Sequence, residues 1–117
     1  SYIQGYNGNI GIKVDLPDGA EKLVFSSRIG NSADSVTRTF AAAISEDGKT
    51  YKVLKEVNFF PKPGYIECEY DIKGKKTVYI RFIRKIAKGD SAAYGFGALF
   101  KEFLVRCTGK YQGDSLN

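Results

Sequence analysis

The chain has 117 residues, the size of one domain, and its 43% hydrophobic content with eight Phe and eight Tyr can fill a core. It contains no histidine, which excludes the commonest transition-metal ligand and every catalytic triad that depends on histidine. The net charge is +5, and no apolar run approaches the ~20 residues that a membrane-spanning helix needs. We therefore expect a single domain over residues 1–117, without a membrane span.

Most of the chain alternates apolar and polar residues with the period of two that is typical of strands with one buried face. We expect strands at residues 10–16, from Leu23 onward, and at residues 36–45, 50–57, 66–72, 77–84 and 98–107. Pro17-Asp18-Gly19 ends the first strand as a turn, and Asp47-Gly48 joins the third and fourth strands as a hairpin. Residues 30–35 and 87–97 have the composition of loops.

The second half of the chain contains the clearest strands and one ambiguous segment. Phe59 and Phe60 precede two prolines and a glycine, so they either form an exposed aromatic patch or pack beneath a loop. Residues 66–72 and 77–84 alternate cleanly, whereas the spacing in residues 98–107 would also suit a helix. The β-rich context favours a strand there. Seven or eight short strands indicate an all-β antiparallel sandwich or jelly roll.

The two cysteines are expected in the core. Cys68 shares its strand face with Ile66, and Cys107 shares its face with Phe103 and Val105. Two buried thiols are the favoured state. A disulfide remains an alternative, since it depends on whether the two Cα atoms lie within about 7 Å of each other.

The densest basic cluster lies at an expected hairpin tip. Lys73, Lys75 and Lys76 flank Gly74 between two strands. A nucleic-acid surface would need basic residues gathered on one face of the domain. A solvated turn is therefore favoured, and no nucleic-acid partner is expected.

Two arginines are expected on or beside the strand face opposite Val78, Ile80 and Phe82. Arg81 and Arg84 could there bind a carboxylate or a phosphate. The alternative is a set of cross-strand ion pairs with partners like Glu67 or Glu69.

Four short segments form a series along residues 10–107. They are Val14-Asp15-Leu16-Pro17, residues 43–51 with Ser-Glu-Asp-Gly-Lys-Thr-Tyr, Val78-Tyr79-Ile80-Arg81-Phe82, and residues 94–105 with an aromatic loop and a Glu. In order and spacing they resemble the galactose-binding, discoidin-like β-sandwich family. This chain departs from the family in its short first segment and in having no Trp.

The resemblance implies a ligand site on loops at one end of the sandwich. Arg28, Asn31 and Asp34 hold the place of the family's polar contacts, and Tyr94 and Phe96 that of its aromatic contacts. An aromatic ring packs on the C–H face of a pyranose, and the polar side chains bind its hydroxyls. The alternative is that Tyr94 and Phe96 pack in the core.

The resemblance also implies a structural calcium ion. Glu102 matches a family glutamate that often ligates Ca²⁺ together with backbone carbonyls of an early loop. Calcium takes six to eight oxygen ligands, and the early loop is short here. The alternative for Glu102 is a salt bridge with Lys or Arg.

The family contains many carbohydrate-binding modules attached to glycoside hydrolases. We therefore expect a non-catalytic module that targets a secreted or cell-surface enzyme to glycans, with neighbouring domains in a larger protein. The alternative is a structural or protein-interaction domain of a surface or tail protein, because a fold does not determine a ligand. A glycosidase that uses Glu67 and Glu69 is the least favoured reading, since both look like a solvent-exposed strand face.

Overall fold

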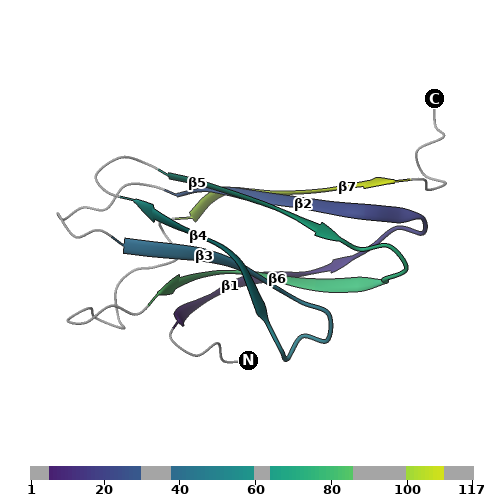
Figure 1. Ribbon diagram of the computed structural model, residues 1–117, viewed down its shortest axis with the longest axis horizontal. Coiled ribbons are helices and arrows are strands. Elements are labelled where there is room, and N and C mark those ends of the chain that lie inside the picture. The colour runs from purple at the N-terminus through teal and green to yellow at the C-terminus, as the bar shows by residue number, and fades with distance from the viewer. Residues whose placement is uncertain (1–5, 30–37, 60–63, 86–99, 110–117) are drawn as a thin grey trace.

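The computed structural model describes residues 6–29, 38–59, 64–85 and 100–109, nearly all of them in strands (Figure 1). The strands are β1 (Tyr6–Asp15), β2 (Ala20–Ile29), β3 (Arg38–Ser45), β4 (Lys52–Phe59), β5 (Gly64–Asp71), β6 (Thr77–Lys85) and β7 (Phe100–Gly109). There is no helix in these ranges, so the strand predicted for residues 98–107 is confirmed over its described part.

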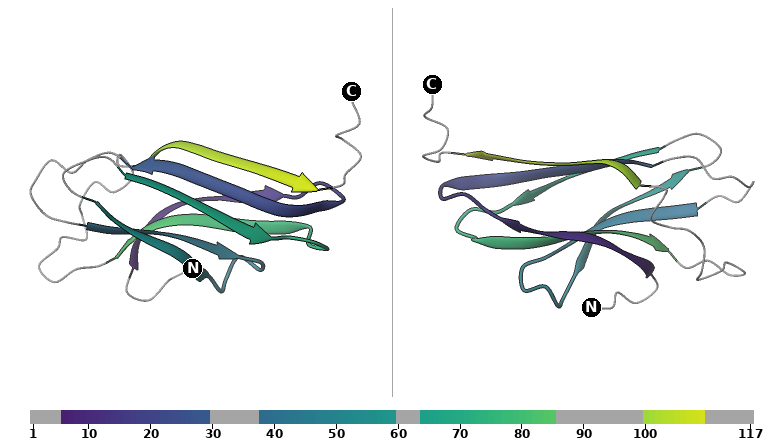
Figure 2. Two further views of the ribbon diagram at one scale, coloured as in Figure 1. Left: turned by 45° about the horizontal axis from the view of Figure 1, so that its top comes forward. Right: turned by 180° about the vertical axis from the view of Figure 1, so that it is seen from behind.

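The strands form two antiparallel sheets that face each other (Figure 2). One sheet has the order β1-β6-β3-β4, and the other has the order β5-β2-β7. Antiparallel sheets of this kind bury one face and expose the other, which is why the sequence alternates. The prediction of an all-β antiparallel sandwich is confirmed.

The core lies between the sheets and is built around phenylalanine. The ring centroid of Phe82 lies 4.8 Å from that of Phe103, with the two rings edge to face, and 6.0 Å from the ring centroid of Phe25. The residues buried around them are Ala20, Leu23, Phe40, Ala42, Ile44, Ile66, Cys68, Ile72, Val78 and Ile80. The alternation predicted for residues 66–72 and 77–84 thus directs the expected side chains inward.

A register shift in β4 exchanges the two faces of that strand. The pairing of β3 with β4 shifts between Ala42 and Ala43, opposite Leu54. Leu54 and Val57 therefore pack against the core between the sheets, whereas Tyr51 and Val53 pack on the outer face of the four-stranded sheet. A bulge adds one residue to a strand and so reverses the faces beyond it.

The structure corrects the prediction for Arg84. Its side chain is only 1% exposed, because Arg84 is an even-numbered residue of β6 and shares the inward face of Ile80 and Phe82. Arg81 lies on the outer face, as expected. The predicted pairing with Glu67 or Glu69 is also wrong, since both glutamates lie exposed on β5 of the other sheet, and Glu69 pairs there with Lys22 at 3.2 Å.

The two cysteines lie on opposite sides of β2 and are not bridged. Cys68 on β5 pairs with Phe25, and Cys107 on β7 pairs with Leu23. Two strand spacings separate the cysteines by about 10 Å, beyond the ~7 Å limit for a disulfide. Cys68 is buried, as expected, whereas Cys107 is only partly buried.

We expect the two thiols to react with a chromogenic disulfide at very different rates. Burial raises the pKa of Cys68 to about 11 and also raises the pKa of Cys107, so little of the reactive thiolate is present at pH 8. In the native protein Cys107 should react first, and Cys68 should react only on unfolding. In the Cys107→Ala variant only Cys68 remains, so its labelling rate can be assigned. Rapid labelling of this variant in its native state would contradict the burial of Cys68.

Candidate functional site

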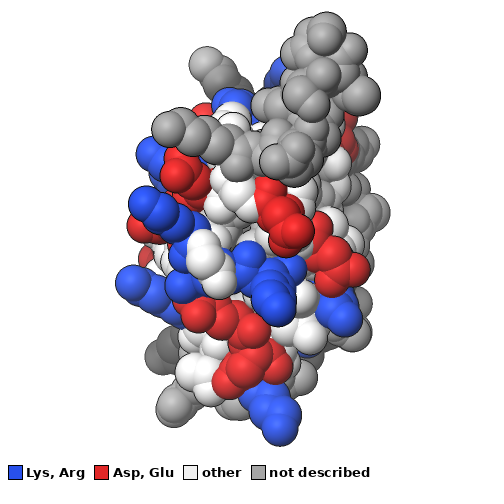
Figure 3. Space-filling view, turned by 90° about the vertical axis from the view of Figure 1, so that its right-hand side faces the viewer, with Lys and Arg blue, Asp and Glu red and all other residues white. Residues whose placement is uncertain are grey.

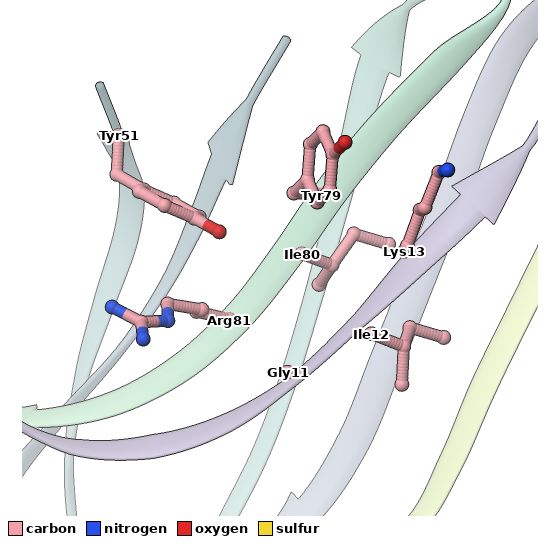
Figure 4. Close-up of a pocket in the computed structure, with 7 residues that line it drawn as sticks. All are labelled: Gly11, Ile12, Lys13, Tyr51, Tyr79, Ile80 and Arg81. Atoms are coloured by element: carbon pink, nitrogen blue, oxygen red, sulfur yellow. The ribbon is translucent and has the colours of Figure 1, made fainter. Parts of the chain in front are cut away.

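An open hollow lies on the outer face of the four-stranded sheet. It has a volume of about 230 Å³ and is lined by Gly11, Ile12 and Lys13 of β1, by Tyr79, Ile80 and Arg81 of β6, and by Tyr51. Figure 4 shows Arg81 close beside the Tyr51 ring and the Lys13 side chain beside Tyr79. Aromatic and cationic side chains from three separate segments therefore surround one space.

Small residues in the sheet explain why this space exists. Gly11 lies opposite Arg81 on one side, and Ala43 lies opposite Arg81 on the other. A Cβ atom at Gly11 would come within 2.6 Å of the Ile80 carbonyl oxygen and 2.9 Å of Arg81 Cγ. The absence of a side chain at Gly11 lowers the floor of the hollow, and the small side chain of Ala43 lies beneath Tyr51. Tyr51, Tyr79 and Arg81 form the walls.

A cation–π contact orients the guanidinium of Arg81. Its central carbon lies 5.0 Å from the centroid of the Tyr51 ring, within the range of an attractive interaction. Tyr51 in turn packs on the small apolar cluster of Ala41, Ala43 and Ile83. The guanidinium is thus stacked against a ring that is itself supported by the sheet.

The hairpin between β3 and β4 positions the other ring. Gly48 has a φ of 79°, and a Cβ atom there would meet three carbon atoms of the Tyr79 ring at 3.1–3.3 Å. The side chain of Asp47 accepts hydrogen bonds from the backbone N–H groups of Lys49, at 2.7 Å, and Thr50, at 2.9 Å. The Asp-Gly turn predicted from sequence is therefore also one support of the hollow.

We expect the hairpin to make stability depend on pH below pH 4. Hydrogen bonds from the backbone of Thr50 and Lys49 and from Ser45 lower the pKa of Asp47 from 3.8 to about 2. A carboxylate whose pKa is lowered in the folded state stabilises it above pH 3.8, and this contribution disappears as the pH falls towards 2. The Asp47→Asn variant should therefore be less stable than the parent at pH 5, and the gap should narrow at pH 2. Urea unfolding at both pH values measures it, and a gap that is independent of pH would contradict the expectation.

The described part of the site predicted from sequence lies on the other sheet. Arg28 is exposed near the end of β2, and its Nε atom donates a hydrogen bond to Glu102 Oε2. Its guanidinium carbon also lies 6.0 Å from the ring centroid of Tyr65, the residue opposite it on β5. Asn31, Asp34, Tyr94 and Phe96 lie outside the described residues, so their predicted meeting with Arg28 stays a prediction.

Glu102 forms the salt bridge that the sequence left open as its alternative to calcium. It has a φ of 53° at a register shift of β7 against β2, and its side chain is 58% exposed. Within the described ranges, no group of three or more acidic or cysteine side chains gathers to hold a metal ion. The described residues by themselves do not provide a set of calcium ligands around Glu102. The calcium ion that the resemblance implies stays a prediction.

Two other hollows lie at the end of the sandwich that carries the turns after β1 and β5. They have volumes of about 540 and 250 Å³, and the described residues that line them include Lys73 and Glu21 in both cases and no aromatic residue. Figure 3 shows acidic and basic side chains interleaved on this end, and Lys75 pairs with Glu46 at 3.4 Å. The prediction of a hairpin there is wrong, because β5 and β6 belong to different sheets and the turn with the lysine cluster connects them. The cluster does lie among carboxylates, as a solvated turn does.

Sequence reasoning identified one member of the hollow and missed the others. Arg81 was predicted on the outer face, where it could bind a carboxylate or a phosphate or form a cross-strand ion pair. Tyr79 shares that face with Arg81 two residues earlier, so alternation was a sufficient signal for it. The other members come to the hollow only through strand pairing and the bulge in β4, which alternation within one strand does not reveal. They include Tyr51, Lys13 and Gly11.

Comparisons with protein-family models, with curated proteins and with solved structures found no match to this chain. No helix within the described ranges is long and apolar enough to cross a membrane. The resemblance to the galactose-binding, discoidin-like family stays a prediction.

Proposed function

We propose that this chain is a non-catalytic carbohydrate-binding domain that targets a secreted enzyme to glycans. The observation that carries the proposal is the hollow in which the rings of Tyr51 and Tyr79 stand beside the guanidinium of Arg81. Sugar-binding surfaces combine ring faces for the apolar C–H groups with fixed hydrogen-bond donors for the hydroxyls. Both kinds of group are present here within one space.

The size and openness of the hollow support a polysaccharide more than an enclosed small molecule. Its volume of about 230 Å³ lies below the ~300–1,000 Å³ of pockets that enclose a drug-sized ligand. A single sugar ring of a longer chain that crosses the outer face of the sheet suits such a space. Weak binding is expected from one stacked ring and a few hydrogen bonds, with Kd between roughly mM and tens of µM.

The non-catalytic role is supported by the surroundings of the glutamate pair considered for glycoside cleavage. Glu67 and Glu69 lie exposed on β5, in the sheet that does not carry the hollow. Glu67 accepts a hydrogen bond from the Tyr65 hydroxyl at 2.8 Å, and Glu69 pairs with Lys22. Both carboxylates thus interact with neighbours on their own sheet, away from the proposed sugar.

A matched pair of tyrosine variants tests the proposal. We expect Tyr51→Ala to weaken binding to a retained polysaccharide about tenfold or more, because the stacking surface is removed. Tyr65→Ala removes a half-exposed ring that also lies beside an arginine, but on the other sheet, and should leave binding unchanged. Affinity electrophoresis through gels that contain neutral or acidic polysaccharides provides the measurement.

Two further observations separate loss of the site from loss of the fold. Tyr51→Phe keeps the ring that packs on Ala43 and should retain most of the binding. Unfolding midpoints of each variant show whether the sheet is intact. If Tyr65→Ala is no longer retarded in the polysaccharide gel and Tyr51→Ala still is, the sugar binds at the end of the sandwich that was predicted from sequence. Absence of binding to every polysaccharide would reject the proposed function and favour a structural domain.

A further inference from the structure

The hollow has a positive lining. Of the seven described residues that surround it, Lys13 and Arg81 are cationic and none is acidic. Lys13 pairs with Tyr79 across the strands, and Gly11 pairs with Arg81, so the two cations are diagonal neighbours on one face. Diagonal neighbours in an antiparallel pair lie about 7–8 Å apart at their backbones, within the common reach of two long side chains. Both cations can therefore approach a single anionic group in the hollow.

Arginine and lysine have different roles in such a pair. The guanidinium of Arg81 is planar, and its parallel N–H groups match the two oxygens of a carboxylate. Its stacking on Tyr51 reduces the freedom that it loses on binding. Lys13 is exposed and supplies a mobile point charge.

We propose that the hollow is specific for an acidic sugar, a uronic acid residue of a polysaccharide. Its carboxylate would bind to Arg81 and Lys13, and its pyranose ring would lie against Tyr79 or Tyr51. This inference rests on the proposed function and adds the class of ligand to it. The planar fork of arginine favours a carboxylate, and a sulfated sugar is the alternative source of the same charge.

The test compares two ligands that differ in whether their carboxyl groups are ionised or esterified. Titration calorimetry of the 117-residue chain uses a galacturonic acid oligosaccharide and its methyl ester, with a sulfated oligosaccharide as a third ligand. We expect the acid to bind about tenfold or more tightly than the ester, the range of a hydrogen-bonded charged group. This preference should shrink as sodium chloride is raised, because the charges at an open site are screened.

Two arginine variants provide the matched control, since each arginine lies against a tyrosine ring. Arg81→Gln should abolish the preference for the acid, and Arg28→Gln, on the other sheet, should retain it. Lys13→Gln is a second variant at an exposed position, where folding is not at risk, and should reduce the preference severalfold. Circular dichroism shows whether each variant is folded.

Each remaining outcome rejects a defined part of the inference. Equal binding of acid and ester, or a preference that survives Arg81→Gln, overturns the acidic ligand and leaves carbohydrate binding in place. Tighter binding of the sulfated oligosaccharide overturns the carboxylate. A preference lost in Arg28→Gln overturns the location. No binding of any of the three ligands overturns this inference, and the affinity gels with neutral polysaccharides then decide the proposed function separately.

Discussion

Replacement of Phe82 by alanine should destabilise the protein by about 3–5 kcal/mol, the usual cost of truncating a buried phenylalanine. The side chain of Phe82 is fully buried and contacts Phe103 of β7 edge to face, with Phe25 of β2 nearby. It belongs to the four-stranded sheet, and both of these partners belong to the other sheet. Its loss therefore leaves a cavity at the interface on which the sandwich depends.

The matched control is another large apolar residue on the outer face. Leu104 lies on β7 beside Phe103, but 60% of it is exposed. Leu104→Ala should change the free energy of unfolding by less than about 0.5 kcal/mol, as surface substitutions usually do. Urea unfolding followed by circular dichroism compares the two variants. A similar cost for both substitutions would mean that the core is not where we describe it.

Replacement of Gly11 by alanine should both destabilise the edge strand and fill the hollow. The added Cβ would lie 2.6 Å from a backbone oxygen of β6, so β1 must shift away from its partner. Overpacking of this kind typically costs about 1–3 kcal/mol. The added methyl group should also make the hollow between the tyrosine rings shallower, and a shallower hollow should bind a sugar more weakly.

Lys13→Ala separates the two effects of the Gly11 substitution. Lys13 lies two residues along the same strand and is exposed, so its truncation should leave stability within about 0.5 kcal/mol of the parent. It should weaken binding only of charged sugars. Unfolding midpoints and calorimetric titrations of both variants make the measurement. An unchanged midpoint for Gly11→Ala would contradict the close approach of β1 and β6.

The strands were predictable because their signal is local. Each of β5 and β6 directs alternate side chains to water and to the core, so Ile66, Cys68, Val78 and Ile80 could be assigned to the interior from spacing alone. The ambiguous segment at residues 98–107 was assigned to a strand by its context, since its spacing fits either structure. The Asp-Gly turn was predictable because its backbone requirement is carried by two adjacent residues.

Alternation along one strand is not a sufficient guide where pairing or packing between strands changes the local pattern. The bulge opposite Ala42 and Ala43 reverses the faces of β4, so Tyr51 lies outside and Val57 lies inside, although both are odd-numbered. Arg84 continues the inward face of β6, against the expectation that a charge leaves the core. Neither outcome follows from residue type.

The sequence by itself determined the fold class, the inward faces of the central strands and the turn at Asp47-Gly48, because these depend on neighbours in the chain. Only the tertiary structure decided which side chains meet. It paired Arg28 with Glu102 across β2 and β7, 74 residues apart. It also brought Lys13, Tyr51 and Arg81 around one hollow. Such meetings depend on sheet order, register and bulges, which are set by the packing of the whole sandwich rather than by any one strand.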